Sequence, residues 1–198
     1  MGLTIRAAMA STRCASDGGD PTRITSNPDG GDIPGDYSPS GTHLVFKRFR
    51  GLVVVGLFVV DIAADGTGDG EPRQLSPERM VLDDTEHAGR WSPDGEEILF
   101  VAHKSRDHHK SIWVIDVGAD GGAPRQLTIG PGCGGPIGEA DQYGCYWPGW
   151  SADGDKIVFT RSEPGGSNES IWIVNADGSD LVQVTDGADD NPVWGTPP

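Results

Sequence analysis

One decapeptide occurs three times in this chain with few changes. It reads "WSPDGEEILF" at 91–100, "WSADGDKIVF" at 150–159 and "YSPSGTHLVF" at 37–46. An apolar run ending in Asp-Gly follows each copy, and a short block ending in Ser or Thr comes next. The order of these blocks never varies, whereas their spacing does. The chain therefore contains an internal repeat, and loops of different length are inserted between the elements of each copy.

Each repeat predicts four short strands, here named a to d. Strand a ends on the aromatic residue, and the tight-turn sequence Ser-Pro-Asp-Gly stops it, since Pro presets φ and Gly accepts positive φ. In the middle repeat, strand b covers 98–100, strand c 112–115 and strand d 125–128. No segment shows a helical period. Four antiparallel strands per unit predict an all-β fold, a β-propeller whose blades bury their apolar faces against one another.

The motif is similar to the repeat of TolB-like β-propellers, a WD40-like, PD40-type repeat that runs W-S-P-D-G-x-x-I-x-F, then I-W, D-G and L-T. Residues 91–128 match almost fully, 150–185 carry Ala152 for Pro, and the first copy has Tyr37 for Trp and Ser40 for Asp. We expect blades at about 33–76, 77–128 and 146–185. The resemblance implies protein interaction, often in the bacterial envelope.

The two ends of the chain predict a fourth blade, split between residues 1–25 and 190–198. Residues 20–25 repeat strand d, while 3–7 and 11–14 fit strands b and c less well, and 191–195 read as a strand a. About four blade equivalents leave three arrangements open. The chain closes as a four-bladed ring, pairs with a second copy into eight blades, or is a fragment of a longer propeller.

Composition narrows the class of partner. The formal net charge is −15, and so acidic a surface repels nucleic acid and anionic lipid. No apolar run approaches the length of a membrane-spanning helix, and the first residues lack the apolar core of a signal peptide. We therefore expect no nucleic acid and no membrane insertion, whereas a protein or peptide partner is what the resemblance implies. A periplasmic or extracellular location is favoured by the resemblance and by the cysteines.

Three cysteines are present, of which Cys133 and Cys145 flank a Gly-rich segment. A disulfide between them suits this spacing and implies an oxidising compartment, although two free thiols are the alternative. A metal site is disfavoured, because no C-x-x-C spacing occurs and no His lies nearby.

The predicted binding face is the one that carries the b–c and d–a connections. These connections are long and all different, whereas the a–b and c–d turns on the opposite face are short and nearly identical, and binding usually resides on variable loops. The candidate residues are His87, Asp83, Asp84, His103, Arg106, His108, His109, Asp141, Tyr143 and Arg161. Imidazole and carboxylate suit divalent metals, but no spacing matches a chelating motif, so we expect solvated loop residues and no metal.

Catalytic signatures are absent from the sequence. It contains no G-x-S-x-G elbow, H-E-x-x-H helix, phosphate-binding glycine loop or dinucleotide fingerprint. We therefore expect no enzymatic activity and no cofactor, and predict a scaffold that binds a protein or peptide through its loop-rich face. Two alternatives stay open. One is a detached propeller domain of a prolyl-oligopeptidase-type peptidase or other larger enzyme, and the other is a metal- or carbohydrate-binding propeller.

Overall fold

The computed structural model describes residues 12–13, 21–78, 80–82, 87–105, 108–118, 122–129, 133, 144–162 and 168–195. Fifteen strands account for the regular structure of these ranges. Among the described residues, none belongs to a helix with the length and apolarity needed to cross a membrane.

Three antiparallel sheets, each formed by a continuous stretch of chain, make up the fold. The first contains β3 (Asp32–Tyr37), β4 (His43–Arg50), β5 (Val53–Ile62) and β6 (Gly68–Gln74) in that order. In the second, β9 (Glu97–His103) and β10 (Lys110–Asp116) lie between β11 (Arg125–Gln126) and two short strands, β7 (Val81–Leu82) and β8 (Arg90–Trp91). The third contains β12 (Cys145–Trp150), β13 (Lys156–Ser162), β14 (Glu169–Asn175) and β15 (Val182–Gln183).

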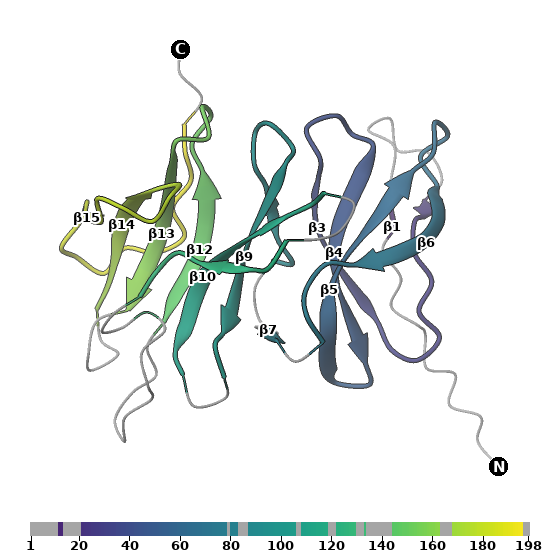
Figure 1. Ribbon diagram of the computed structural model, residues 1–198, viewed down its shortest axis with the longest axis horizontal. Coiled ribbons are helices and arrows are strands. Elements are labelled where there is room, and N and C mark those ends of the chain that lie inside the picture. The colour runs from purple at the N-terminus through teal and green to yellow at the C-terminus, as the bar shows by residue number, and fades with distance from the viewer. Residues whose placement is uncertain are drawn as a thin grey trace.

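The sheets follow one another along a row, with the third at one end and the first near the other (Figure 1). Each is a meander of the expected a, b, c and d strands, so the prediction of propeller blades is confirmed. The register also repeats, because the aromatic residue of strand b faces that of strand c in the pairs Phe46–Phe58, Phe100–Trp113 and Phe159–Trp172. We call the side of a blade toward the preceding unit its front face, and the side toward the next unit its back face.

Apolar side chains from facing sheets form the cores between blades. Between the first and second blades lie Val45, Leu57, Val59, Leu75, Ile98, Phe100, Ala102 and Ile115. Between the second and third lie Leu99, Val101, Ile112, Val114, Leu127, Ile157, Phe159 and Val174. The two faces of one strand thus enter two different cores, which explains why strand b reads as a continuous apolar run.

The third repeated block contains the end of strand d and a Ser or Thr after it. Its hydroxyl accepts a backbone N–H of strand c at 2.9–3.0 Å: Leu57 donates to Ser76, Ile112 to Thr128 and Ile171 to Thr185. Its glutamine folds back and donates to the carbonyl two residues later in all three blades. The Gln-x-Ser/Thr pattern therefore satisfies buried backbone groups where a short strand d leaves the ladder.

Tryptophans of strand a join neighbouring blades through their indole N–H groups. The indole nitrogen of Trp91 donates to the carbonyl of Asp36 at 3.0 Å, and that of Trp150 donates to Arg90 at 3.3 Å. In each case the acceptor lies directly before the aromatic residue of the preceding blade. Trp194 makes the same bond to Gly149 at 3.0 Å. Residues 191–195 therefore lie where strand a of a following blade would lie.

The expected strand a at 191–195 is not a strand, however, because no described strand pairs with it. At the other end, β1 (Thr12–Arg13) pairs with β2 (Thr22–Arg23). Ile24, which follows β2, is buried against Leu44, Phe46 and Val60 of the first blade. The two parts of the expected split blade lie at opposite ends of the row (Figure 1), so the structure does not bring them together. Their completion into one blade stays a prediction.

The a–b turns of the second and third blades are each held by a carboxylate that favours its ionised form. In the second blade the Ser92 hydroxyl donates to Asp94, which also accepts the N–H of Glu96, and these bonds lower the pKa of Asp94 below its ordinary value of 3.8. The same arrangement lowers the pKa of Asp153. The repeated Ser-x-Asp-Gly sequence is thus a turn with its own hydrogen bonds.

These turns predict a loss of stability in acid. A carboxyl whose pKa is lowered by folding contributes stability above its ordinary pKa, and that contribution is lost as pH falls through the folded-state value. We expect the melting temperature of the Asp94→Asn/Asp153→Asn variant to change less than that of the wild type between about pH 5 and pH 2. Thermal melts across this range measure it, and equal slopes would contradict the assignment.

Candidate functional site

The ten predicted binding residues fall into two groups. Asp83, Asp84, Arg106, Asp141 and Tyr143 lie outside the described residues. The structure places His87, His103, His108, His109 and Arg161.

Two of the histidines hold their own hairpin together. The ring Nδ1 of His103, at the end of β9, donates to the carbonyl of His108 at 2.7 Å. The Nδ1 of His108 lies 2.7 Å from the hydroxyl of Ser105. His109 is buried. These contacts stabilise the b–c connection of the second blade and occupy the Nδ1 atoms of His103 and His108.

Arg161 lies in β13 of the third blade. Its guanidinium stacks on the ring of Trp172 at 4.6 Å, as the guanidinium of Arg48 stacks on Phe58 at 5.3 Å in the first blade. Arg161 therefore packs on an aromatic ring of strand c, as Arg48 does in the first blade. Within the described part of the chain, no three His, Cys, Asp or Glu residues come close enough to hold a metal ion.

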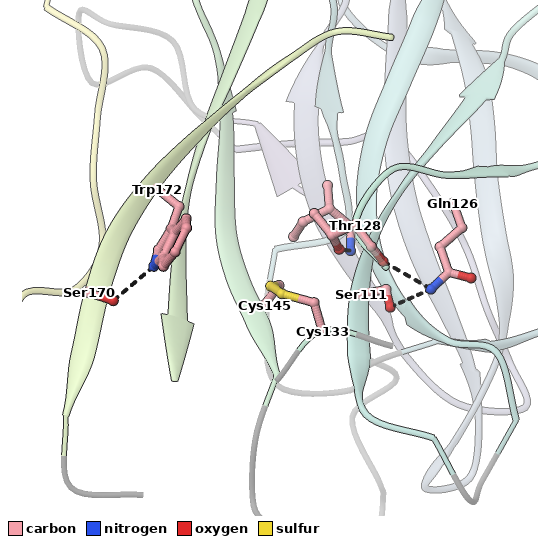
Figure 2. Close-up of a disulfide and its surroundings, with 8 residues drawn as sticks. Ser111, Gln126, Thr128, Cys133, Cys145, Ser170 and Trp172 are labelled. Carbon is pink, nitrogen blue, oxygen red and sulfur yellow. Dashed lines mark hydrogen bonds between the residues drawn. A yellow bond between two sulfur atoms is a disulfide. The ribbon is translucent and has the colours of Figure 1, made fainter. Parts of the chain in front are cut away.

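A disulfide joins Cys133 to Cys145, with their Cα atoms 5.4 Å apart. Both cysteines are buried in the core between the second and third blades, and Cys145 is the first residue of β12. Figure 2 shows the bond between Trp172 on one side and Ser111 and Thr128 on the other. The disulfide thus links the long d–a connection to the first residue of strand a of the third blade.

Removing this bridge is expected to cost about 3 kcal/mol of folding stability, because it closes a loop over a sequence separation of 12. The Cys133→Ala/Cys145→Ala variant should therefore show this loss in urea unfolding. Cys14→Ala is the matched control, since the structure gives the bridge to the other two cysteines. Equal stability of the double variant and the wild type would contradict this expectation.

A hollow that mixes apolar and polar groups lies along the inner strands. It measures about 350 Å³ and lies between strand a of the second blade, strand a of the third blade and residues 191–194. Its lining includes Trp91, Trp147, Trp150 and Trp194, with His87, Arg90 and Asp36. We call this hollow the tryptophan cleft.

An irregularity of strand a places Trp147 in this cleft. The register between β12 and β13 shifts between Tyr146 and Gly149, and Trp147 adopts a φ of 51° there. Strand a of the first blade has the same kind of shift, between Pro34 and Tyr37. Such bulges redirect a side chain, and here the redirected one is an indole whose ring meets His87 at 5.9 Å, edge to face. Sequence reasoning missed this site, although "YWPGW" at 146–150 carries the signal of two tryptophans around Pro-Gly.

One ion pair borders the cleft and joins two blades. The Arg90 Nη1 atom lies 3.1 Å and 3.2 Å from the two carboxylate oxygens of Asp36, and both side chains are 39% exposed. At such exposure the pair contributes little to stability. It leaves a polar edge beside the indole rings, which is the composition typical of binding sites for peptides and small molecules.

A second hollow of about 460 Å³ lies among the short turns between the first and second blades. Two of its polar side chains are engaged within the fold, since Arg73 donates to the carbonyl of Val117 and His43 pairs with Asp61. It has one aromatic wall, Trp91, whereas the tryptophan cleft has four. The larger hollow is thus the poorer candidate.

Comparisons with known proteins point to one architecture. No protein-family model matches the chain. The Tol-Pal system protein TolB of Anaeromyxobacter dehalogenans is 30% identical over 153 residues, which cover 70% of this chain and 30% of that protein. A TolB-type structure from Agrobacterium tumefaciens superposes with a TM-score of 0.69 at 22% identity, over 96% of this chain and 63% of that one.

The propeller of a hydrolase is also similar. Puromycin hydrolase superposes with a TM-score of 0.60 at 18% identity, covering 86% of this chain and 25% of that enzyme. The chain spans less than a third of the length of the curated relatives that it matches.

Proposed function

We propose that this chain, which is a TolB-like β-propeller, is a non-catalytic binding module that holds a peptide segment of a partner protein in the tryptophan cleft. The cleft is the observation that carries this proposal. Three of its four indoles stand on β8 and β12, and that of Trp194 lines the cleft beside them. Tryptophan is among the residues that dominate binding energy at protein interfaces.

The shape of the cleft favours an extended peptide. It runs along strand a, from His87 before β8 to Pro93 in the a–b turn, so a bound segment would follow the strand direction. Aromatic-lined grooves of this kind suit proline-containing segments, whose preset backbone loses little entropy on binding. The Arg90–Asp36 pair at the edge offers one charge of each sign to polar groups of the segment.

The comparisons support a protein partner in general. The relative from Anaeromyxobacter dehalogenans is named for the Tol-Pal system, an assembly of proteins. The net charge of −15 adds a bias, because a basic segment would approach this chain more readily than an acidic one. The predicted loop-rich face contributes His87 to the same cleft.

The test uses a displayed library of random peptides selected on the purified chain. The best selected peptide should bind Trp147→Ala about thirtyfold more weakly than wild type, the effect of removing a buried aromatic anchor. Tyr37→Ala is the matched control, because Tyr37 is an exposed aromatic of strand a that does not line the cleft. Equal affinity for Trp147→Ala and wild type, with both folded, would refute the proposal.

A second function has an observation of its own. The likeness to puromycin hydrolase supports the alternative that the chain is the propeller part of a larger hydrolase. Reading the coding sequence outward on both sides would decide it. A G-x-S-x-G elbow in the same reading frame would favour the hydrolase, and its absence there would favour the binding module.

A further inference from the structure

The back face of the third blade differs from the back faces of the first two. Val184 follows β15, and its N–H bonds to Ile171, as Leu75 bonds to Leu57 and Leu127 bonds to Ile112. These three residues therefore occupy one position of the repeat. Leu75 and Leu127 are each 6% exposed, whereas Val184 is 53% exposed. This position is thus buried between blades in the first two blades, and it is exposed in the third blade.

The neighbouring side chains of this face follow the same rule. Val182 pairs with Ile173 across β15 and β14, so both point to the side of Val184, and Val182 is 56% exposed. In the earlier blades the position of Val182 carries Arg73 and Arg125. Each of these arginines donates to a carbonyl of the next blade, Val117 and Ala176. The back face of the third blade is therefore more apolar than those of the first two blades, and it lacks an arginine at this position.

Among the residues that the structure describes, those at 191–195 cover the inner part of this face. The N–H of Asn191 donates to the Thr160 hydroxyl, and Trp194 bonds to Gly149. Thr160 is buried as a result. Residues 191–195 thus lie at the place of strand a of a further blade, and strands b, c and d of that blade would cover the rest.

Strands with the matching register occur at the other end of the chain. In the second blade, Trp113 of strand c faces Gln126 of strand d. In the N-terminal unit Thr12 of β1 faces Arg23 of β2, and Ile24 follows at the position of Leu127. β1 and β2 are therefore strands c and d of a blade that packs in front of the first blade. They lie at the far end of the row from residues 191–195 (Figure 1).

We propose that the back face of the third blade binds the N-terminal unit of a second copy of this chain. Residues 191–195 of one copy and β1–β2 of the other then belong to one blade. Because each copy offers both parts, two such contacts related by a two-fold axis close the assembly and leave no open apolar face. The contact extends the packing already seen at the two preceding junctions. It does not depend on a peptide in the tryptophan cleft.

Sedimentation of the full 198-residue chain tests this proposal. We expect a mass near twice the 20.9 kDa of one chain, and a fall to the mass of one chain for Val184→Glu. Leu52→Glu is the matched control, since Leu52 is exposed in the β4–β5 turn, away from this face, and should leave the dimer unchanged. Circular dichroism shows whether each variant is folded.

A second measurement needs no variant. In the wild type, the exchange of the backbone amides of β15 with deuterium should slow as protein concentration rises, while that of β4 should not change. A wild-type monomer at all concentrations would overturn the proposal. So would a dimer that Val184→Glu leaves intact, because its interface would then lie elsewhere.

Discussion

Replacing Phe100 by alanine is expected to lower the free energy of unfolding by about 3–5 kcal/mol, the usual cost of deleting a buried aromatic ring. Phe100 is 1% exposed and lies in the core between the first and second blades. Its deletion leaves a cavity that two packed sheets cannot close, since both are held by their own strand ladders. Urea unfolding monitored by tryptophan fluorescence measures the loss.

The control is Val53→Ala in the first blade. Val53 is 60% exposed, and truncation at such a position changes stability by less than about 0.5 kcal/mol. Similar effects of the two changes would mean that the sheets do not pack on each other through strand b. The stacked-blade description would then be wrong.

Arg48→Met is expected to destabilise the chain by about 3–5 kcal/mol, because it leaves a buried carboxylate without its counter-charge. The Arg48 Nε and Nη2 atoms each lie 2.9 Å from an oxygen of Asp32, whose side chain is fully buried. These bonds to Asp32 raise the pKa of Arg48. Methionine keeps the apolar contact with Phe46 and Phe58, over which the guanidinium lies at 5.2 Å and 5.3 Å.

A double-mutant cycle separates the charge from the packing. Asp32→Asn combined with Arg48→Met removes both charges, so the double variant should be more stable than the sum of the single effects predicts. Thermal and urea unfolding of the four proteins provide the coupling energy. Additive effects would show that the pair does not act as a unit.

The blades could be predicted because their determinants are local. A turn such as Ser92–Gly95 carries its own hydrogen bonds, and the register of a tight hairpin follows from it. The same holds for strand d, where Thr128 and Gln126 bond to backbone groups nearby in the sheet. Each repeat therefore specifies its meander without information from distant residues.

The cleft could not be predicted because it depends on three segments that meet only in the folded chain. Trp147 reaches it through a bulge, and Trp194 reaches it by occupying the place of a strand that lacks a partner. The contacts of the loop histidines could not be predicted either. The Nδ1 atoms of His103 and His108 bond within their own hairpin, and a binding role for these side chains stays a prediction.

The central claim is that the tryptophan cleft is the binding site, and the indole N–H signals test it most directly. The chain has six tryptophans, of which Trp113 and Trp172 do not line the cleft. In a ¹⁵N-labelled sample, adding the best library-selected peptide should shift the indole signal of Trp147 together with those of other cleft tryptophans, and leave Trp113 and Trp172 unmoved. Shifts confined to Trp113 or Trp172, or no shift at saturating peptide, would contradict the claim.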